Sequence, residues 1–119
     1  MGLDMYAYKT KENIPPANFT DPEDATEIFY WRKHPNLHGW MHNLYDGKGG
    51  EQPDFNCDPV RLDAEDIDAL EKDLDNLPHG SGPFFGESRP EDKLDDIRFI
   101  ETARQALREG YTIFYTSWW

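Results

Sequence analysis

The chain has 119 residues and a mass of 13.9 kDa, which is enough for one domain with a single core. Its formal net charge is −12, from 24 acidic and 12 basic residues, so phosphate backbones and anionic membrane surfaces are repelled on average. We therefore expect neither nucleic acid nor a membrane as a direct partner. Aromatic residues make up 14% of the chain against 37% for all hydrophobic residues, which predicts an aromatic core.

No apolar run reaches the ~18 residues that a membrane-spanning helix needs. The start of the chain lacks the basic and apolar pattern of a secretory signal. The single cysteine suits a reducing compartment, because it excludes an intramolecular disulfide. Together these features lead us to expect a cytoplasmic protein.

Two strand patterns separated by a loop open the chain. In residues 3–8 hydrophobic side chains alternate with polar or larger aromatic ones, and this period of two predicts a strand. Residues 9–26 hold prolines, asparagines and aspartates, which favour a surface loop. The β-branched and aromatic residues of 27–32 predict a second strand.

A helix and a third strand pattern follow. Pro35 suits the first turn of a helix, where the backbone amides have no partner within the helix, and the helix should run to about Tyr45. The glycine-rich residues 46–54 then predict a second surface loop. Residues 55–62 suit a third strand, which Pro59 restricts to the edge of a sheet or to a bulge because it lacks a backbone donor.

The rest of the chain predicts two further helices and a final strand. Asp63 is a suitable N-cap for one helix, and Pro90 opens a longer helix that Gly110 ends. Residues 111–119 alternate in the manner of a strand. The side chains expected to face the core form one stripe on each helix: Ile67, Leu70, Leu74 and Leu77 on the first, and Leu94, Ile97, Ile100, Ala103 and Leu107 on the second.

This order of elements predicts an α+β fold in a single compact domain over residues 1–119. Strands and helices that do not alternate regularly favour a small, mainly antiparallel sheet. We expect about four strands, with about three helices packed on one face of the sheet. The order of the strands and the oligomeric state do not follow from the sequence.

Residues 30–42 hold three of the four histidines and are the first place to look for a site. His38 and His42 are four residues apart, so they lie on one side of the expected helix and are the candidate ligands of a metal ion. A metal would need a third ligand, and the glutamate beside the first histidine of zinc proteases is missing. A helical wheel places both at the half-buried border of the apolar stripe, so we expect structural histidines and neither a metal nor another cofactor.

Four side chains are candidates for binding a small ligand: Arg32, His38, Cys57 and Ser81. Arg32 lies beside aromatic residues and can hold a carboxylate or phosphate, or it can pair with Asp4 on a neighbouring strand. Cys57 would become a reactive thiolate beside a histidine, whereas most lone cysteines are small buried hydrophobic residues. Ser81 belongs to a glycine-rich loop, residues 81–86, whose amides suit a pocket and whose two phenylalanines suit the core. No catalytic residue can be named from these motifs.

Several short motifs occur in order along nearly the whole chain. They are MGLDMY at the start, YWRK at residues 30–33, His38 and Trp40, Cys57, SGPFFG at residues 81–86, and the SW of Ser117 and Trp118. This ordered set resembles a family of small uncharacterised proteins encoded mainly by bacteriophages. Two departures are Pro83, where that family usually has phenylalanine, and a second terminal tryptophan, Trp119. The resemblance implies an α+β fold and a phage origin but no activity.

Members of that family often carry a phosphoglycerate-kinase label, which this chain does not support. A phosphoglycerate kinase has two domains and several times this length. The GKGG of residues 47–50 also lacks the spacing and the hydroxyl residue of a phosphate-binding P-loop. The label therefore adds nothing to the expected function.

We expect a phage accessory protein that acts in the host cytoplasm by binding another protein, without enzymatic activity. The acidic residues between 63 and 109 favour a basic host protein as that partner. The alternative is a small-ligand-binding protein or an enzyme, with a pocket around Arg32, His38, Cys57 and the loop 81–86. The alternative requires these residues to line one open cleft, whereas imitation of nucleic acid requires the helix carboxylates to share one continuous face.

Overall fold

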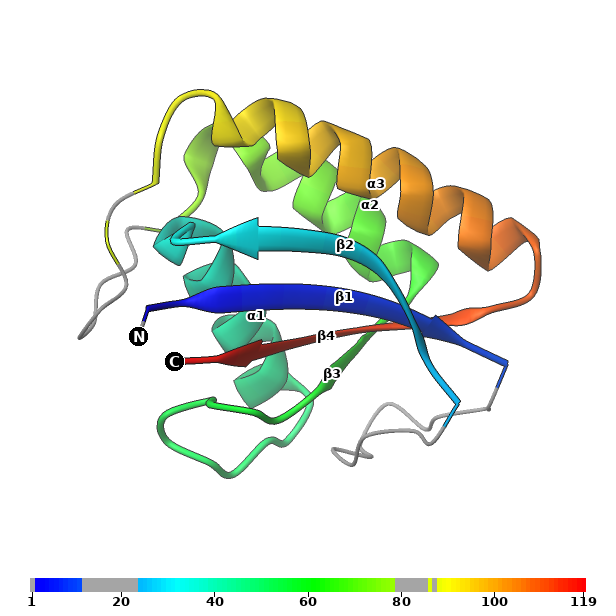
Figure 1. Cartoon of the computed structure of the whole chain (residues 1–119), viewed down its shortest axis with the longest axis horizontal. Coiled ribbons are helices and arrows are strands. Elements are labelled where there is room, and N and C mark those ends of the chain that lie inside the picture. The colour runs from blue at the N-terminus through cyan, green and yellow to red at the C-terminus, as the bar shows by residue number, and fades with distance from the viewer. Residues whose placement is uncertain (1, 12–23, 79–85, 87) are drawn as a thin grey trace.

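The computed structural model of this protein describes residues 2–11, 24–78, 86 and 88–119. In these residues the chain forms a four-stranded antiparallel sheet with three α-helices on one of its faces (Figure 1), so the expected α+β fold is confirmed. The elements in chain order are β1 (Asp4–Thr10), β2 (Thr26–Arg32), α1 (Pro35–Gly47), β3 (Val60–Leu62), α2 (Ala64–Asp73), a 3-10 turn (Leu74–Asn76), α3 (Asp92–Arg108) and β4 (Thr112–Trp118).

The strands run in the order β2-β1-β4-β3, and each neighbouring pair is antiparallel. The last strand of the chain therefore lies inside the sheet, between β1 and β3. Alternation along β1 buries Met5 and Ala7 on the helix side and places Tyr6 and Tyr8 on the outer face. In Figure 1 no helix crosses this outer face.

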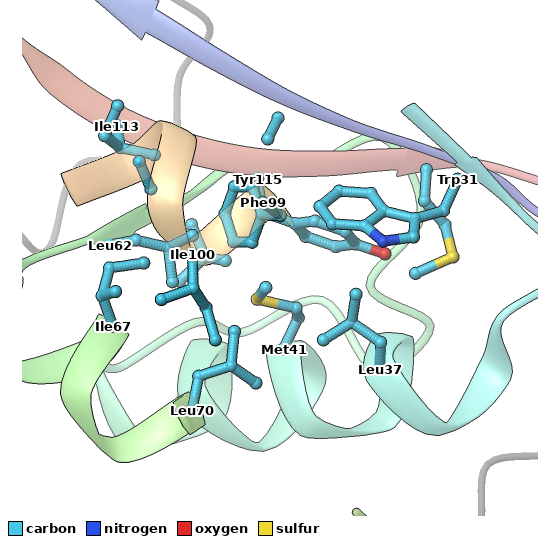
Figure 2. Packing of buried hydrophobic residues seen from close by; sticks show 14 of the residues in the cluster. Trp31, Leu37, Met41, Leu62, Ile67, Leu70, Phe99, Ile100, Ile113 and Tyr115 are labelled. Carbon is cyan, nitrogen blue, oxygen red and sulfur yellow. The ribbon is translucent and has the colours of Figure 1, made fainter. Parts of the chain in front are cut away.

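Among the described residues, the core between sheet and helices holds five buried aromatic side chains and thirteen other hydrophobic ones, so the expectation of an aromatic core is only partly met. Trp31 of β2 meets Phe99 of α3 edge to face, with ring centroids 4.8 Å apart. Phe55, from the segment before β3, lies 4.6 Å from the ring of Tyr45 in α1 and 5.9 Å from that of Tyr115 in β4. Figure 2 shows the rings of Trp31, Phe99 and Tyr115. It also shows the non-aromatic side chains of the same core: Leu37 and Met41 of α1, Leu62 of β3, Ile67 and Leu70 of α2, and Ile100 of α3.

The helices begin close to the residues that the sequence predicts. Pro35 is the first residue of α1. Asp63 is the N-cap of α2, and its backbone N–H donates to the Asp66 carboxylate at 2.8 Å in a capping box. Pro90 stands in the turn just before α3. Gly110 follows α3 with φ +88°, a left-handed conformation that glycine adopts without steric cost.

The third strand is shorter than expected. We predict a strand over residues 55–62, but β3 covers only its last three residues, Val60–Leu62. Phe55 and Cys57 have φ values of +47° and +68°, which lie in the left-handed region that a strand cannot contain. The expectation that this strand lies at an edge is confirmed, because β3 pairs with β4 alone among the described strands.

Both expected surface loops are too long. β1 continues through Thr10 and β2 begins at Thr26, so the loop predicted over residues 9–26 loses residues at both ends, and most of the remainder lies outside the described part of the chain. Helix α1 continues to Gly47, so the loop predicted over residues 46–54 begins later. The two strands and the helix therefore include some of the residues that were assigned to the loops.

The face of α3 that meets the core also differs from the prediction. Ile100 is buried as expected, but Leu94 and Ile97 are 60% and 39% exposed. Asp92 and Asp96 are buried instead. Asp96 accepts hydrogen bonds inside the protein. These bonds hold the first half of α3 so that the two buried acidic side chains face the core and the two exposed apolar side chains face solvent.

Two isoleucines of α3 provide a matched test of this orientation. We expect Ile100→Ala to lower the free energy of unfolding by about 2–5 kcal/mol, because it leaves a cavity in the core, and Ile97→Ala to lower it by less than about 1 kcal/mol. Urea denaturation of the two variants and the unmodified protein measures both values. Equal losses would contradict the observed rotation of the helix.

Candidate functional site

Arg32 lies on the outer face of the sheet and is paired with a neighbouring strand. Its Nε is 3.9 Å from Oδ1 of Asp4, which is also its register partner in β1. Of the two roles expected for Arg32, the structure shows the pairing with Asp4 on the neighbouring strand. Both side chains are partly exposed, so the ion pair itself contributes little to stability.

His38 is packed inside the core, so the half-buried position expected for it is wrong. Its side chain is 2% exposed, its ring stacks on Phe55, and its Nδ1 lies 2.7 Å from the hydroxyl of Tyr115. Burial, followed by the charge of nearby His42, lowers the pKa of His38 from 6.5 to about 4. Burial also raises the pKa of Tyr115 well above its usual value. His38 is thus a neutral core residue at pH 7.

His42 is the more accessible of the two histidines. Its Nε2 lies 3.7 Å from Asp46, one turn further along α1, and the ring centroids of His38 and His42 are 6.4 Å apart. Among the described residues, no group of three His, Cys, Asp or Glu side chains is placed to hold a metal ion.

Cys57 is exposed, which contradicts the expectation of a small buried hydrophobic residue. Its left-handed backbone belongs to the segment before β3, and its N–H donates to the carbonyl of Ser117 at 2.8 Å. Ser81 and the loop 81–86, except Gly86, lie outside the described residues. Arg32 thus lies on the outer face of the sheet, His38 in the core and Cys57 in an exposed segment. Binding of one ligand by all three residues stays a prediction.

The outer face of the sheet carries a group of aromatic side chains, which we call the outer aromatic patch: Tyr6, Tyr8, Tyr30 and Trp118. The rings of Tyr6 and Tyr30 are 5.4 Å apart, and those of Tyr6 and Tyr8 are 6.1 Å apart. Trp118 is 70% exposed and Tyr30 is 45% exposed. Aromatic surface of this size in contact with water is uncommon in isolated domains and is typical of binding sites.

Asp4, the first residue of β1, provides a negative charge at one end of the outer aromatic patch. It stands opposite Arg32 on one neighbouring strand and opposite Trp118 on the other. The Tyr30 hydroxyl donates to Asp4 Oδ1 at 2.5 Å, and this hydrogen bond is the main cause that raises the pKa of Tyr30 to about 12. The outer face therefore combines neutral phenol and indole rings with the Asp4 carboxylate and its ion-pair partner Arg32.

A buried polar cluster lies on the other side of the sheet, where β2, the start of α1 and α3 meet. We call it the His34 cluster. His34 Nε2 is 2.9 Å from Oδ2 of Asp96, whose other oxygen accepts the indole N–H of Trp31 at 3.2 Å. His34 Nδ1 is 2.7 Å from the Ser88 hydroxyl, which also accepts the backbone N–H of Asn36 at 3.0 Å. His34 and Asp96 are both buried.

The His34 cluster borders a hollow of about 450 Å³. Ser88 is half-buried at its wall, and the largely exposed side chains of Arg89 and Lys93 lie beside it. Arg89 is 3.6 Å from Asp92, and Lys93 pairs with Asp75. Ionisable groups, a hydroxyl and an opening to solvent therefore meet at this place.

Sequence reasoning missed the His34 cluster because its members come from three separate parts of the chain. His38 and His42 have a helical spacing that marks them in the sequence, whereas a single histidine before Pro35 carries no such pattern. One signal was present: Asp92 and Asp96 continue, at intervals of four, the buried stripe that includes Ile100. Acidic side chains on the core-facing side of a helix indicate a buried partner, because a buried carboxylate has to be hydrogen-bonded or paired.

Cations interrupt the acidic surface of the helices. The guanidinium of Arg104 in α3 lies 2.7 Å from Asp68 and 2.8 Å from Glu71 in α2. Lys93 likewise pairs with Asp75 after α2. Described carboxylates between the two helices are therefore partly neutralised, which counts against a continuous acidic face that would imitate nucleic acid.

Comparison of the chain with protein-family models, with curated proteins and with solved structures found no match. Within the part of the chain that the structure describes, no helix is both long and apolar enough to span a membrane.

The burial of His38 predicts an acid-sensitive stability. Because its pKa is lower in the folded state, the unfolded state takes up the proton first, and stability falls as the pH drops from about 6.5 towards 4. Between pH 7 and pH 5 we expect this group to cost about 2 kcal/mol of the free energy of unfolding. Chemical denaturation at both pH values measures the fall, which should be smaller by that amount in His38→Gln.

His42→Gln is the matched control, because it changes a more accessible histidine on the same helix. Its stability should decline between pH 7 and pH 5 as in the unmodified protein. A decline that is unchanged in His38→Gln would show that His38 does not cause it.

Proposed function

We propose that this chain is a bacteriophage-encoded protein-interaction module that acts in the host cytoplasm and binds a basic protein through the outer aromatic patch. The observation that carries this proposal is the exposure of two large rings, Trp118 at 70% and Tyr30 at 45%, on a sheet face that no described helix covers. Exposed Trp and Tyr side chains are common at the centres of protein interfaces, where burying them releases water from apolar surface.

The chemistry of the patch favours a cationic side chain in the partner. An arginine or lysine stacked on Tyr30 or Trp118 gains a cation–π interaction, and Asp4 is near enough to these rings to balance its charge. The net charge of −12 adds attraction over a longer range and speeds the encounter with a basic protein.

The shape of the patch favours a protein over a small molecule. Its members lie on the three adjacent strands β2, β1 and β4, so they form part of the face of a sheet. Small ligands favour concave sites that bury most of their surface, whereas protein interfaces are broad. This supports the interaction module over the small-ligand alternative.

A labelled arginine-rich peptide provides a defined probe. We expect it to bind the unmodified protein with a salt-dependent affinity that Trp118→Ala lowers about 10-fold or more, because the ring supplies the stacking surface. Asp4→Asn should lower the affinity about 10-fold by removing the carboxylate beside the rings. Fluorescence anisotropy at several salt concentrations measures these affinities.

Asp95→Asn is the matched control, because it removes one negative charge from the exposed surface of α3, away from the patch. It should change the affinity less than about 2-fold. Equal effects of Asp4→Asn and Asp95→Asn would mean that the peptide senses only net charge, and the outer aromatic patch would then not be the site.

The natural partner is identified by placing a photo-crosslinking amino acid at position 118 and, as a control, at position 94, which is exposed on α3. In infected cells we expect one basic protein to be crosslinked from position 118 and not from position 94. An acidic protein, or equal crosslinking from both positions, contradicts the proposal.

A further inference from the structure

The His34 cluster has the three components of an activated hydroxyl. Ser88 Oγ, the imidazole of His34 and the carboxylate of Asp96 follow one another at 2.7 Å and 2.9 Å. A hydroxyl within hydrogen-bond reach of a base, with the base oriented by a third group, is the arrangement that makes serine a nucleophile. Nothing in the interaction proposed above uses these residues, which lie on the helix side of the sheet.

The hydrogen bonds assign one role to each atom. Asp96 Oδ1 accepts from Trp31, and Oδ2 faces His34 Nε2, which therefore carries the proton and donates it to the carboxylate. His34 Nδ1 is then left as the acceptor, and it faces the Ser88 hydroxyl. The Asn36 N–H already donates to Ser88 Oγ, so the hydroxyl proton is available for His34. This is the tautomer that a general base requires.

The order of the two ring nitrogens is the reverse of that in chymotrypsin-like hydrolases, where Nε2 faces the serine. The chemistry depends on the roles and not on the nitrogen labels. One nitrogen must hold a lone pair towards the hydroxyl, and the other must hold a proton towards the carboxylate. His34 meets both conditions.

The hollow beside Ser88 limits the size of the substrate. The hollow of about 450 Å³ beside Ser88 has room for a small molecule, and Arg89 and Lys93 present largely exposed cationic side chains there. Asp92 lies 3.7 Å from His34 Nδ1 and accepts the backbone N–H of Arg89, so one carboxylate faces the base from this side as well. Arg89 and Lys93 are already paired with Asp92 and Asp75, so the charges do not call for an anionic substrate, and the size of the hollow suits a small ester.

We propose that Ser88 is a nucleophile, with His34 as its general base, and that it forms an acyl-enzyme intermediate with small esters. Ser88 Oγ adds to the carbonyl carbon while its proton passes to His34 Nδ1. The bond from that carbon to the alcohol oxygen breaks, and the alcohol leaves with the proton from His34. Water then adds to the acyl group and gives a proton to His34, and the acid departs as Ser88 regains that proton. Asp96 acts as a positioning residue.

A purely structural role makes a different prediction. In that case Ser88 serves only to accept the first free N–H of α1, and the cluster only ties that helix to α3. The hydroxyl would then react no faster than other serine hydroxyls. Covalent reactivity therefore distinguishes the two roles, and a stability measurement does not.

The experiment uses the intact protein and a fluorophosphonate probe, which loses fluoride as the serine oxygen bonds to phosphorus. We expect one probe per chain, located on Ser88 by peptide mass spectrometry, and no label in Ser88→Ala. Ser117→Ala is the matched control, because it removes another serine hydroxyl, and it should label as the unmodified protein does. No label on Ser88 in the folded, unmodified protein would overturn the proposal.

Two further variants separate the base from the positioning residue. We expect His34→Gln to slow labelling and the hydrolysis of p-nitrophenyl acetate by about 100-fold or more, the usual contribution of a general base. Asp96→Asn should lower kcat more than it raises KM, because it disturbs the base and not the hollow. Labelling of His34→Gln at the unmodified rate would also overturn the proposal.

Discussion

The burial of Asp96 is the constraint on which much of this structure depends. A carboxylate inside a protein is tolerated only when its oxygens are hydrogen-bonded, and Trp31 and His34 meet that requirement here. These contacts tie α3 to β2 and to the start of α1. They also explain why Leu94 and Ile97, which belong to the apolar stripe of α3, face solvent.

The one-sided cover of the sheet separates two surfaces of different chemistry. The helices bury one face, and alternation along β1, β2 and β4 sends another set of side chains to the opposite face. That outer face carries Tyr30 and Trp118 around a carboxylate, whereas the helix side holds the His34 cluster beside a hollow. The two surfaces do not share a residue, so a substitution on one of them leaves the residues of the other unchanged.

Several features follow from local sequence because they depend on neighbours along the chain. The helix starts at Pro35 and Asp63 and the α+β class are of this kind. The candidate site did not follow in the same way. His38 was assigned to a border from its place on a helical wheel, but a wheel does not contain the rings of Phe55 and Tyr115, which enclose it. Cys57 was expected inside, but its left-handed backbone leaves it exposed.

The sequence by itself determined the approximate positions of the elements and the alternation that gives the sheet two chemically different faces. These follow from periodicity and from capping, which act over a few residues. Only the tertiary structure decided which way α3 faces, and it alone brought His34, Ser88 and Asp96 together. Ser88 lies 54 positions from His34 along the chain, and Asp96 lies 62 positions from it. Contacts of that range depend on how whole elements pack.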